Sequence, residues 1–330
     1  MDLQQSLIAL LKNRIGKDEK IGQVLSEVLG LSLDAAYRRF RGETSFSIYE
    51  LEKISTYFNI SLDDLFNRRI KTVSFDYQLL TDEYFSIELY LSDIRDSLQQ
   101  LKSQENVQLI FTINNSPFFQ LFNSQELLKF KLFFWAKTHL KLSKFQKKRF
   151  SQYSFSKREL ALANEILTIY NSIPSTEIYD PDLLCGFARE INYYFSSKEL
   201  DDSKTALLLY DEMDGLLQHI NDQAKVGAKF GKGEQSEACV PFNMFFNETL
   251  NAVASFYYST NYSQGLFLAH NFMSSLHTNN KEYVVKTKEV LEEIISNSSK
   301  ISAGNMKERK KYFEDVSHQL ERYKTKIAHT

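Results

Sequence analysis

Two short amphipathic segments separated by a glycine constrain the fold of this chain more than any other feature. Apolar residues recur at helical spacing before the glycine, at Ile21, Val24, Leu25 and Val28. The glycine, Gly30, suits the left-handed backbone conformation that ends a helix, and Ser32 offers an oxygen that caps the next one. That second segment, residues 33–41, ends at Gly42. The pattern predicts two short helices joined by a tight turn.

The second segment separates into an apolar and a polar face. The apolar face carries Leu33, Ala36 and Phe40, which we expect to pack on the preceding helix. The polar face carries Asp34, Tyr37, Arg38 and Arg41. Arginine reaches guanine edges and phosphates, and the helix N-terminus at Ser32 suits a DNA backbone. Asp34 has two interpretations: a contact with a cytosine amino group and, favoured here, stabilisation of the first turn through the helix dipole.

Two capping boxes mark further helix starts. Ser47 and Glu50 form the first box, and its helix is expected to run to about Phe58. Residues 61–64 repeat the pattern, and residues 3–11 show an earlier helical repeat of leucines. Each box lies inside a hydrophobic staple, Phe46 with Leu51 and Ile60 with Leu65. These signals predict five short helices in the first part of the chain.

At this point the sequence resembles a known family. The stretch IGQVLSEVLGLSLDAAYRRFRGETSFSIYELEKISTYFNISLDDLF is similar to the Cro/phage-repressor (xenobiotic-response-element) type of DNA-binding domain. The matching features are Gly30 in the turn, Ser32 at the start of the recognition helix and Gly42 at its end. Ser26 and Ala36 depart from the family pattern, which usually has alanine and a larger aliphatic residue there. The resemblance covers about residues 1–67 and implies a five-helix, lambda-repressor-like domain whose helix 33–41 enters the major groove.

The resemblance and the polar face together identify candidate contacts with double-stranded DNA. The candidates on the recognition helix are Ser32, Leu33, Asp34, Tyr37, Arg38 and Arg41. Candidate phosphate contacts from the same domain are Lys20, Arg39, Arg68 and Arg69. The alternative is a protein-interaction bundle whose arginine face is simply solvated.

The rest of the chain reads as mainly α-helical. Apolar side chains alternate over residues 73–77, and residues 107–113 are a second β-rich stretch that ends at a turn; together they predict one small β-hairpin. Helices are expected at 84–102, 124–145, 157–170, 181–195, 203–226, 242–258, 263–276, 281–296 and 305–324, stacked as antiparallel hairpins. Residues 1–70 would thus form the helix-turn-helix domain, and residues 71–330 a mostly helical domain for dimerisation or for sensing a small-molecule or peptide effector.

One segment stands out by charge. The whole chain has a net charge of −2, yet residues 127–158 hold ten lysines and arginines and no acidic residue. The helical spacing places Lys137, Lys141, Lys144 and Lys148 on one narrow stripe, and these four are further candidate phosphate contacts. Such a stripe suits phosphates, an acidic partner or plain solvation.

Sequence motifs for catalysis, metals and membranes are absent. The six histidines and two cysteines show no metal-ligand spacing, so neither a metal nor a cofactor is expected. Residues 227–234 are glycine-rich but lack P-loop spacing, and we interpret them as a mobile loop, with a lid over a ligand as the alternative. Neither a signal peptide nor an apolar run of spanning length appears. Two cysteines alone favour a reduced, cytoplasmic compartment.

These features favour a sequence-specific transcription regulator over other classes. The layout resembles bacterial one-component regulators, and a homodimer is expected because one short helix reads few base pairs. The alternative is a non-enzymatic interaction scaffold whose helix-turn-helix does not read DNA. An enzyme is not expected.

Overall fold

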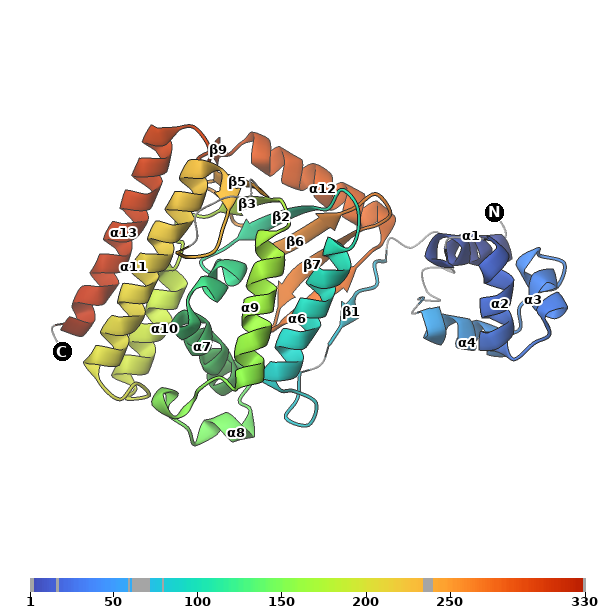
Figure 1. Cartoon of the computed structure of the whole chain (residues 1–330), viewed down its shortest axis with the longest axis horizontal. Helices are drawn as coiled ribbons and strands as arrows, with labels where there is room; N and C mark the ends of the chain where they lie inside the picture. Colours follow the sequence, from blue (N-terminus) through green and yellow to red (C-terminus); the bar gives the residue numbers. More distant parts are fainter. Residues whose placement is uncertain are drawn as a thin grey trace. The chain divides into compact units, whose positions relative to one another are not determined.

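The computed structural model describes residues 3–15, 18–58, 60, 72–78, 80–233 and 240–328. The chain divides into two compact units, Met1–Phe75 and Asp76–Thr330 (Figure 1). Among the helices of these ranges, none is long and apolar enough to cross a membrane.

The first unit has four described helices around a small core. They are α1 (Leu3–Ile15), α2 (Asp18–Leu29), α3 (Leu33–Phe40) and α4 (Ile48–Phe58). The buried apolar side chains are Leu7, Leu11, Ile21, Leu25, Leu29, Ala36, Ile54 and Ile60. The two helices predicted around Gly30 are therefore confirmed as α2 and α3. The fifth helix expected to start at Ser61 lies outside the described residues.

The turn between α2 and α3 follows the predicted chemistry. Gly30 has a φ of +68°, in the left-handed region that favours glycine. The hydroxyl of Ser32 accepts the backbone N–H of Ala35 at 3.3 Å, as an N-cap does. Ser26 adds a second side-chain hydrogen bond to the turn, because its hydroxyl donates to the Leu31 carbonyl at 2.7 Å. Serine in place of the family's usual alanine thus has a local role.

The second unit contains a nine-stranded mixed sheet, so the expectation of a mainly α-helical domain is wrong. Its strands are β1 (Asp76–Tyr77), β2 (Gln108–Ile113), β3 (Ser175–Tyr179), β4 (Ala228–Lys229), β5 (Val240–Phe246), β6 (Ser255–Ser259), β7 (Gln264–His270), β8 (Ser274–Thr278) and β9 (Ser299–Lys300). The strand order is β1-β8-β7-β6-β2-β3-β5-β4, and β9 pairs with β5. The pairs β2–β3 and β3–β5 are parallel, and the others are antiparallel. Parallel neighbours need crossover connections, which the intervening helices supply.

Helices cover both faces of this sheet. They are α6 (Ile87–Lys102), η1 (Phe118–Asn123), α7 (Gln125–Phe134), the π-helical η2 (Trp135–His139), α8 (Ser143–Gln146), η3 (Phe150–Gln152), α9 (Lys157–Asn171), α10 (Cys185–Ser196), α11 (Ser203–Val226), α12 (Lys281–Ser296) and α13 (Met306–Ala328). Along β2, Leu109 and Phe111 belong to the large core on one face, which α6 and α9 cover. Ile110 packs with the cluster under α12 on the other face.

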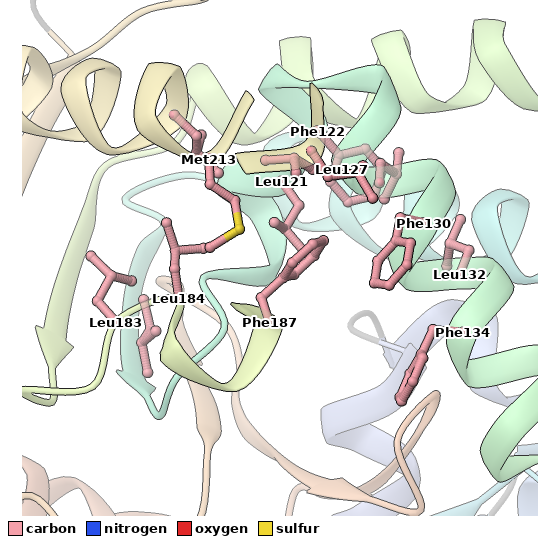
Figure 2. Close-up of a cluster of buried hydrophobic side chains, with 14 of the residues drawn as sticks. Leu121, Phe122, Leu127, Phe130, Leu132, Phe134, Leu183, Leu184, Phe187 and Met213 are labelled. Atoms are coloured by element: carbon pink, nitrogen blue, oxygen red, sulfur yellow. The ribbon is translucent and has the colours of Figure 1, made fainter. Parts of the chain in front are cut away.

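The large core extends beyond the sheet into a group of helices. In Figure 1, α10, α11 and α13 lie side by side, and α13 contacts both of the other two. Figure 2 shows where side chains from η1, α7, α10 and α11 converge, among them Leu121, Phe122, Leu127, Phe130, Phe187 and Met213. Aromatic side chains make up a large part of this core beside leucine and isoleucine, as the 26 phenylalanines of the sequence suggest.

Two segments expected to be helices are strands instead. Residues 242–258 contain most of β5 and nearly all of β6, and residues 263–276 contain β7 and part of β8. In β7, Leu266 and Leu268 pack on one side of the sheet, whereas Phe267 stacks on Phe256 in the aromatic group on the other side. In a strand, apolar side chains on one face recur every two residues. In runs where most residues are apolar or aromatic, apolar side chains also occur at the helical spacing of three to four residues. The apolar spacing therefore did not separate helix from strand.

The prediction of a small β-hairpin within residues 73–113 is also wrong. β1 pairs antiparallel with β8, which places Asp76 opposite His277. β2 lies between β3 and β6, with Leu109 opposite Tyr258. The strands that pair with β1 and β2 lie far away in the sequence, so the local residue pattern does not predict these pairings.

Candidate nucleic-acid interface

Helix α3 presents one face to solvent. Asp34, Arg38 and Arg41 are exposed, as predicted, and Ala36 is fully buried in the core of the first unit. Leu33 was expected to pack on α2, but it is 47% exposed at the first position of the helix. This face therefore combines two guanidinium groups, a carboxylate and an exposed aliphatic side chain.

The two exposed arginines share one carboxylate. Glu43 lies in the loop after α3, and its Oε1 is 2.8 Å from Arg41 Nε. Its Oε2 is 3.7 Å from Arg38 Nε. All three side chains are about half exposed, and ion pairs of this kind contribute only about 0–1 kcal/mol. A phosphate or a guanine edge can therefore replace Glu43 at little cost.

Arg39 forms a mostly buried ion pair within the first unit. Its Nε lies 2.8 Å from Glu50 Oε1, and both side chains are mostly buried. Glu50 also completes the predicted capping box, accepting the backbone N–H of Ser47 at 2.8 Å while Ser47 Oγ accepts that of Glu50. Burial raises the pKa of Glu50, but the Arg39 and Ser47 hydrogen bonds and the Arg39 charge outweigh it and hold the pKa below its ordinary value. The predicted phosphate contact by Arg39 thus falls on a side chain that joins α3 to α4.

Tyr37 sets the distance between α2 and α3. Its half-buried ring lies over Gly22, and a Cβ added at Gly22 would be only 2.4 Å from Tyr37 Cζ. Only glycine allows this approach, since real Cβ atoms do not come that close to a ring. The sequence suggested Tyr37 as a DNA contact, whereas the structure places its ring against the preceding helix.

Further contacts hold the loop that follows α3. The side-chain amide of Gln4 in α1 donates to the carbonyl of Thr44 at 2.8 Å and to that of Arg39 at 3.3 Å. Beyond this loop, Ile48 and Tyr49 at the start of α4 are 82% and 79% exposed. The inward staple residues on either side of them already imply this orientation in the sequence.

The remaining predicted phosphate contacts are dispersed. Arg68, Arg69 and the side chain of Lys20 lie outside the described residues. The stripe expected from four lysines of the second unit does not form, because the helix ends before Lys141, which has a φ of +52°. Lys137 is mostly buried and pairs with Glu199 at 2.6 Å. Lys141, Lys144 and Lys148 are exposed, outside any shared helix.

Carboxylates from elsewhere neutralise much of the basic segment 127–158. The pairs are Lys129–Glu126, Lys131–Glu190, Lys137–Glu199, Arg149–Asp201 and Arg158–Glu165. A charge run in sequence therefore becomes a mixed surface in the fold.

The glycine-rich segment 227–234 is only partly a loop. Residues 228–229 form β4, and the Nζ of Lys229 is buried, donating to the carbonyls of Tyr170 at 3.1 Å and Ile173 at 3.0 Å. Over the parts of the chain that the structure describes, no three His, Cys, Asp or Glu side chains gather as metal ligands would.

Comparison with protein families gives a match for the first part of the chain. Residues 5–88 match the BetR domain, a family of helix-turn-helix DNA-binding domains. The matched range includes the described α2, α3 and α4, and extends to the start of α6. No curated protein and no solved structure matches the chain. The first unit is thus similar to a DNA-binding domain at this broad level.

Proposed function

We propose that this protein is a sequence-specific transcription regulator that reads the major groove with α3. The observation that carries the proposal is the outward face of α3, where Leu33, Arg38 and Arg41 are exposed within a segment that matches a DNA-binding family. Arginine suits guanine O6 and N7, and an aliphatic side chain suits the thymine methyl group.

DNA binding then exchanges one set of partners for another. Arg38 and Arg41 leave Glu43 for base edges or phosphates, and Glu43 turns to solvent. Ser32 keeps its cap, and Asp34 stabilises the first turn of α3. The Arg39–Glu50 pair and the Tyr37–Gly22 contact hold α3 in place, so less conformational entropy is lost on binding.

In this proposal the second unit supports dimerisation or effector sensing. A homodimer would bring two copies of α3 onto two half-sites and multiply specificity. The protein would act in the bacterial cytoplasm as a regulator with no enzymatic activity.

A second candidate is an interaction scaffold. The exposed Ile48 and Tyr49 favour it, because large apolar side chains beside each other on a surface are typical of protein contacts. DNA binding separates the two functions.

The test is to select fragments of the source genome that the purified full chain binds, and then to titrate their affinity with salt. A regulator enriches fragments sharing a motif and loses affinity steeply as salt rises, yet retains its preference over random DNA. The absence of binding at low salt, or binding without any sequence preference, would contradict the proposal.

A further inference from the structure

The second unit encloses a cavity that the proposed DNA contacts do not use. Its volume is about 470 Å³, within the range of small-molecule sites. It lies between one face of the sheet, α6, η1 and the β7–β8 turn. Aromatic rings form much of its wall, including Phe111, Phe118, Phe119, Trp135, Phe256 and Phe267.

These rings are arranged in nearly parallel stacks. Phe111 and Phe256 have centroids 4.8 Å apart and planes 11° apart. Phe256 also stacks on Phe267, with ring centroids 5.4 Å apart and planes 15° apart. Phe119 stacks on Tyr170, with ring centroids 5.1 Å apart and planes 11° apart. Walls made of aligned ring faces favour a flat aromatic guest, which can add to a stack by offset contact.

Two polar atoms in the wall lack a partner. Asn114 Oδ1 and Ser116 Oγ are buried and make no hydrogen bond within the described structure. Both residues follow the end of β2 and line the cavity. Because neither oxygen has accessible surface, a ligand in the cavity does not reach them, and the shape and charge of the wall select the ligand.

The charge of the wall restricts the ligand further. Its ionisable acids are Asp93 and Glu177, and no Lys, Arg or His stands among the described lining residues. Glu177 is 1% exposed and accepts hydrogen bonds from Ser175, Tyr179 and Tyr170. Glu177 interacts with the buried ammonium of Lys229, so Asp93 is the carboxylate that would repel an anionic ligand, and the lining residues offer that ligand no cation.

Phe272 stands where the cavity meets solvent. It lines the cavity, is 55% exposed and stacks on His139 with centroids 3.5 Å apart. Its φ of +66° is unusual for a residue with a bulky side chain. The β7–β8 turn thus holds a strained aromatic residue at the opening, as ligand sites often do.

We propose that this cavity binds a flat aromatic small molecule that carries no negative charge. Under the proposed function this molecule is the effector, but the binding itself needs no DNA.

The test uses Trp135, the single tryptophan of the chain, as a fluorescent reporter in the cavity wall. Three probes are compared at millimolar concentrations with the full chain and without DNA. Benzamide is flat, uncharged and donates N–H; benzoate has nearly the same shape but is anionic; cyclohexanecarboxamide keeps the donor but is not flat. We expect benzamide to change Trp135 emission saturably, with a dissociation constant at least ~10-fold below those of the other two.

A pair of variants locates the contact. Phe119→Leu removes one of the stacked rings of the wall and is expected to weaken benzamide binding several-fold, whereas Ser296→Ala, on the unrelated α12, leaves it unchanged. Thermal unfolding checks that both variants fold. Benzoate binding as tightly as benzamide, no saturable response to benzamide, or equal binding by the Phe119→Leu variant would overturn the proposal. None of these outcomes depends on whether the chain binds DNA.

Discussion

The contact between Gly22 and Tyr37 gives the sharpest prediction on how the helix-turn-helix is held together. In a Gly22→Ala variant the new methyl would lie 2.4 Å from Tyr37 Cζ and 2.5 Å from Cε2. Optimal carbon–carbon contacts are about 3.5–4.0 Å, so the ring or α2 must move. Overpacking of this kind costs about 1–3 kcal/mol, and contact with several ring atoms at once favours the upper end.

The helix propensity of alanine opposes this cost. Replacing a glycine inside a helix stabilises it by about 1 kcal/mol. Gly22→Ala is therefore expected to destabilise the first unit by about 2 kcal/mol when Tyr37 is present. In a Tyr37→Ala background the clash is gone, and the same substitution should stabilise the unit by about 1 kcal/mol. The effect of one substitution thus changes sign with the other.

Amide hydrogen exchange of α2 and α3, followed by mass spectrometry of the full chain, measures this local opening free energy. Gly30→Ala is the control, because nothing lies within 4 Å of its Cβ position and its φ is +68°. That variant should lose about 1–2 kcal/mol to backbone strain in both backgrounds. An equal effect of Gly22→Ala with and without Tyr37 would refute the packing argument.

Further predictions follow from buried and capped charges. Because the pKa of Glu50 is held below its ordinary value, the ionised carboxylate stabilises the folded first unit at pH values above the pKa of Glu50 in the unfolded chain. This stabilisation is lost as pH falls through the pKa of Glu50 in the folded protein. Acidification should thus lower the hydrogen-exchange protection factors of α3 and α4, taken relative to the intrinsic exchange rate at each pH, and Glu50→Gln should reduce this pH dependence. Lys131 and Glu190 form a mostly buried pair at 2.7 Å. Burial lowers the pKa of Lys131 and raises that of Glu190. Lys131→Met should destabilise the second unit by about 3–5 kcal/mol in urea unfolding, and adding Glu190→Leu should recover most of that loss; a double variant as unstable as the single one would contradict this account. Burial also raises the pKa of Cys185 to about 11, so iodoacetamide should modify this thiol slowly until the protein unfolds; rapid labelling of the native protein would count against it.

The helix-turn-helix was predictable because its signals are local. Gly30, the Ser32 cap and the Ser47–Glu50 box each act within a few residues, and all three occur as expected. The contact between Gly22 and Tyr37 was missed because it joins two different helices, in which the two residues looked like an ordinary helix residue and a surface phenol. Glu43 is close to Arg38 and Arg41 in sequence but was missed because it lies beyond the predicted helix.

The second unit was mispredicted for a different reason. Its long helices, such as α9, α11 and α12, were expected at nearly the right positions because they have clear caps and long repeats. The strands are short, and their partners lie far along the chain, as with Leu109 and Tyr258. The cavity was not foreseeable, since its wall is assembled from η1, α6 and several strands.

The affinity of α3 variants for a selected genomic fragment tests the central claim most directly. Fluorescence anisotropy at fixed salt would compare Arg38→Ala and Arg41→Ala with Lys310→Ala, a more exposed cation that pairs with Glu314 in the second unit. Loss of a bidentate base contact costs about 1–3 kcal/mol, so at least one arginine variant should bind ~5- to 150-fold more weakly while Lys310→Ala stays within about twofold. Wild-type affinity in both arginine variants would contradict the claim that α3 reads DNA.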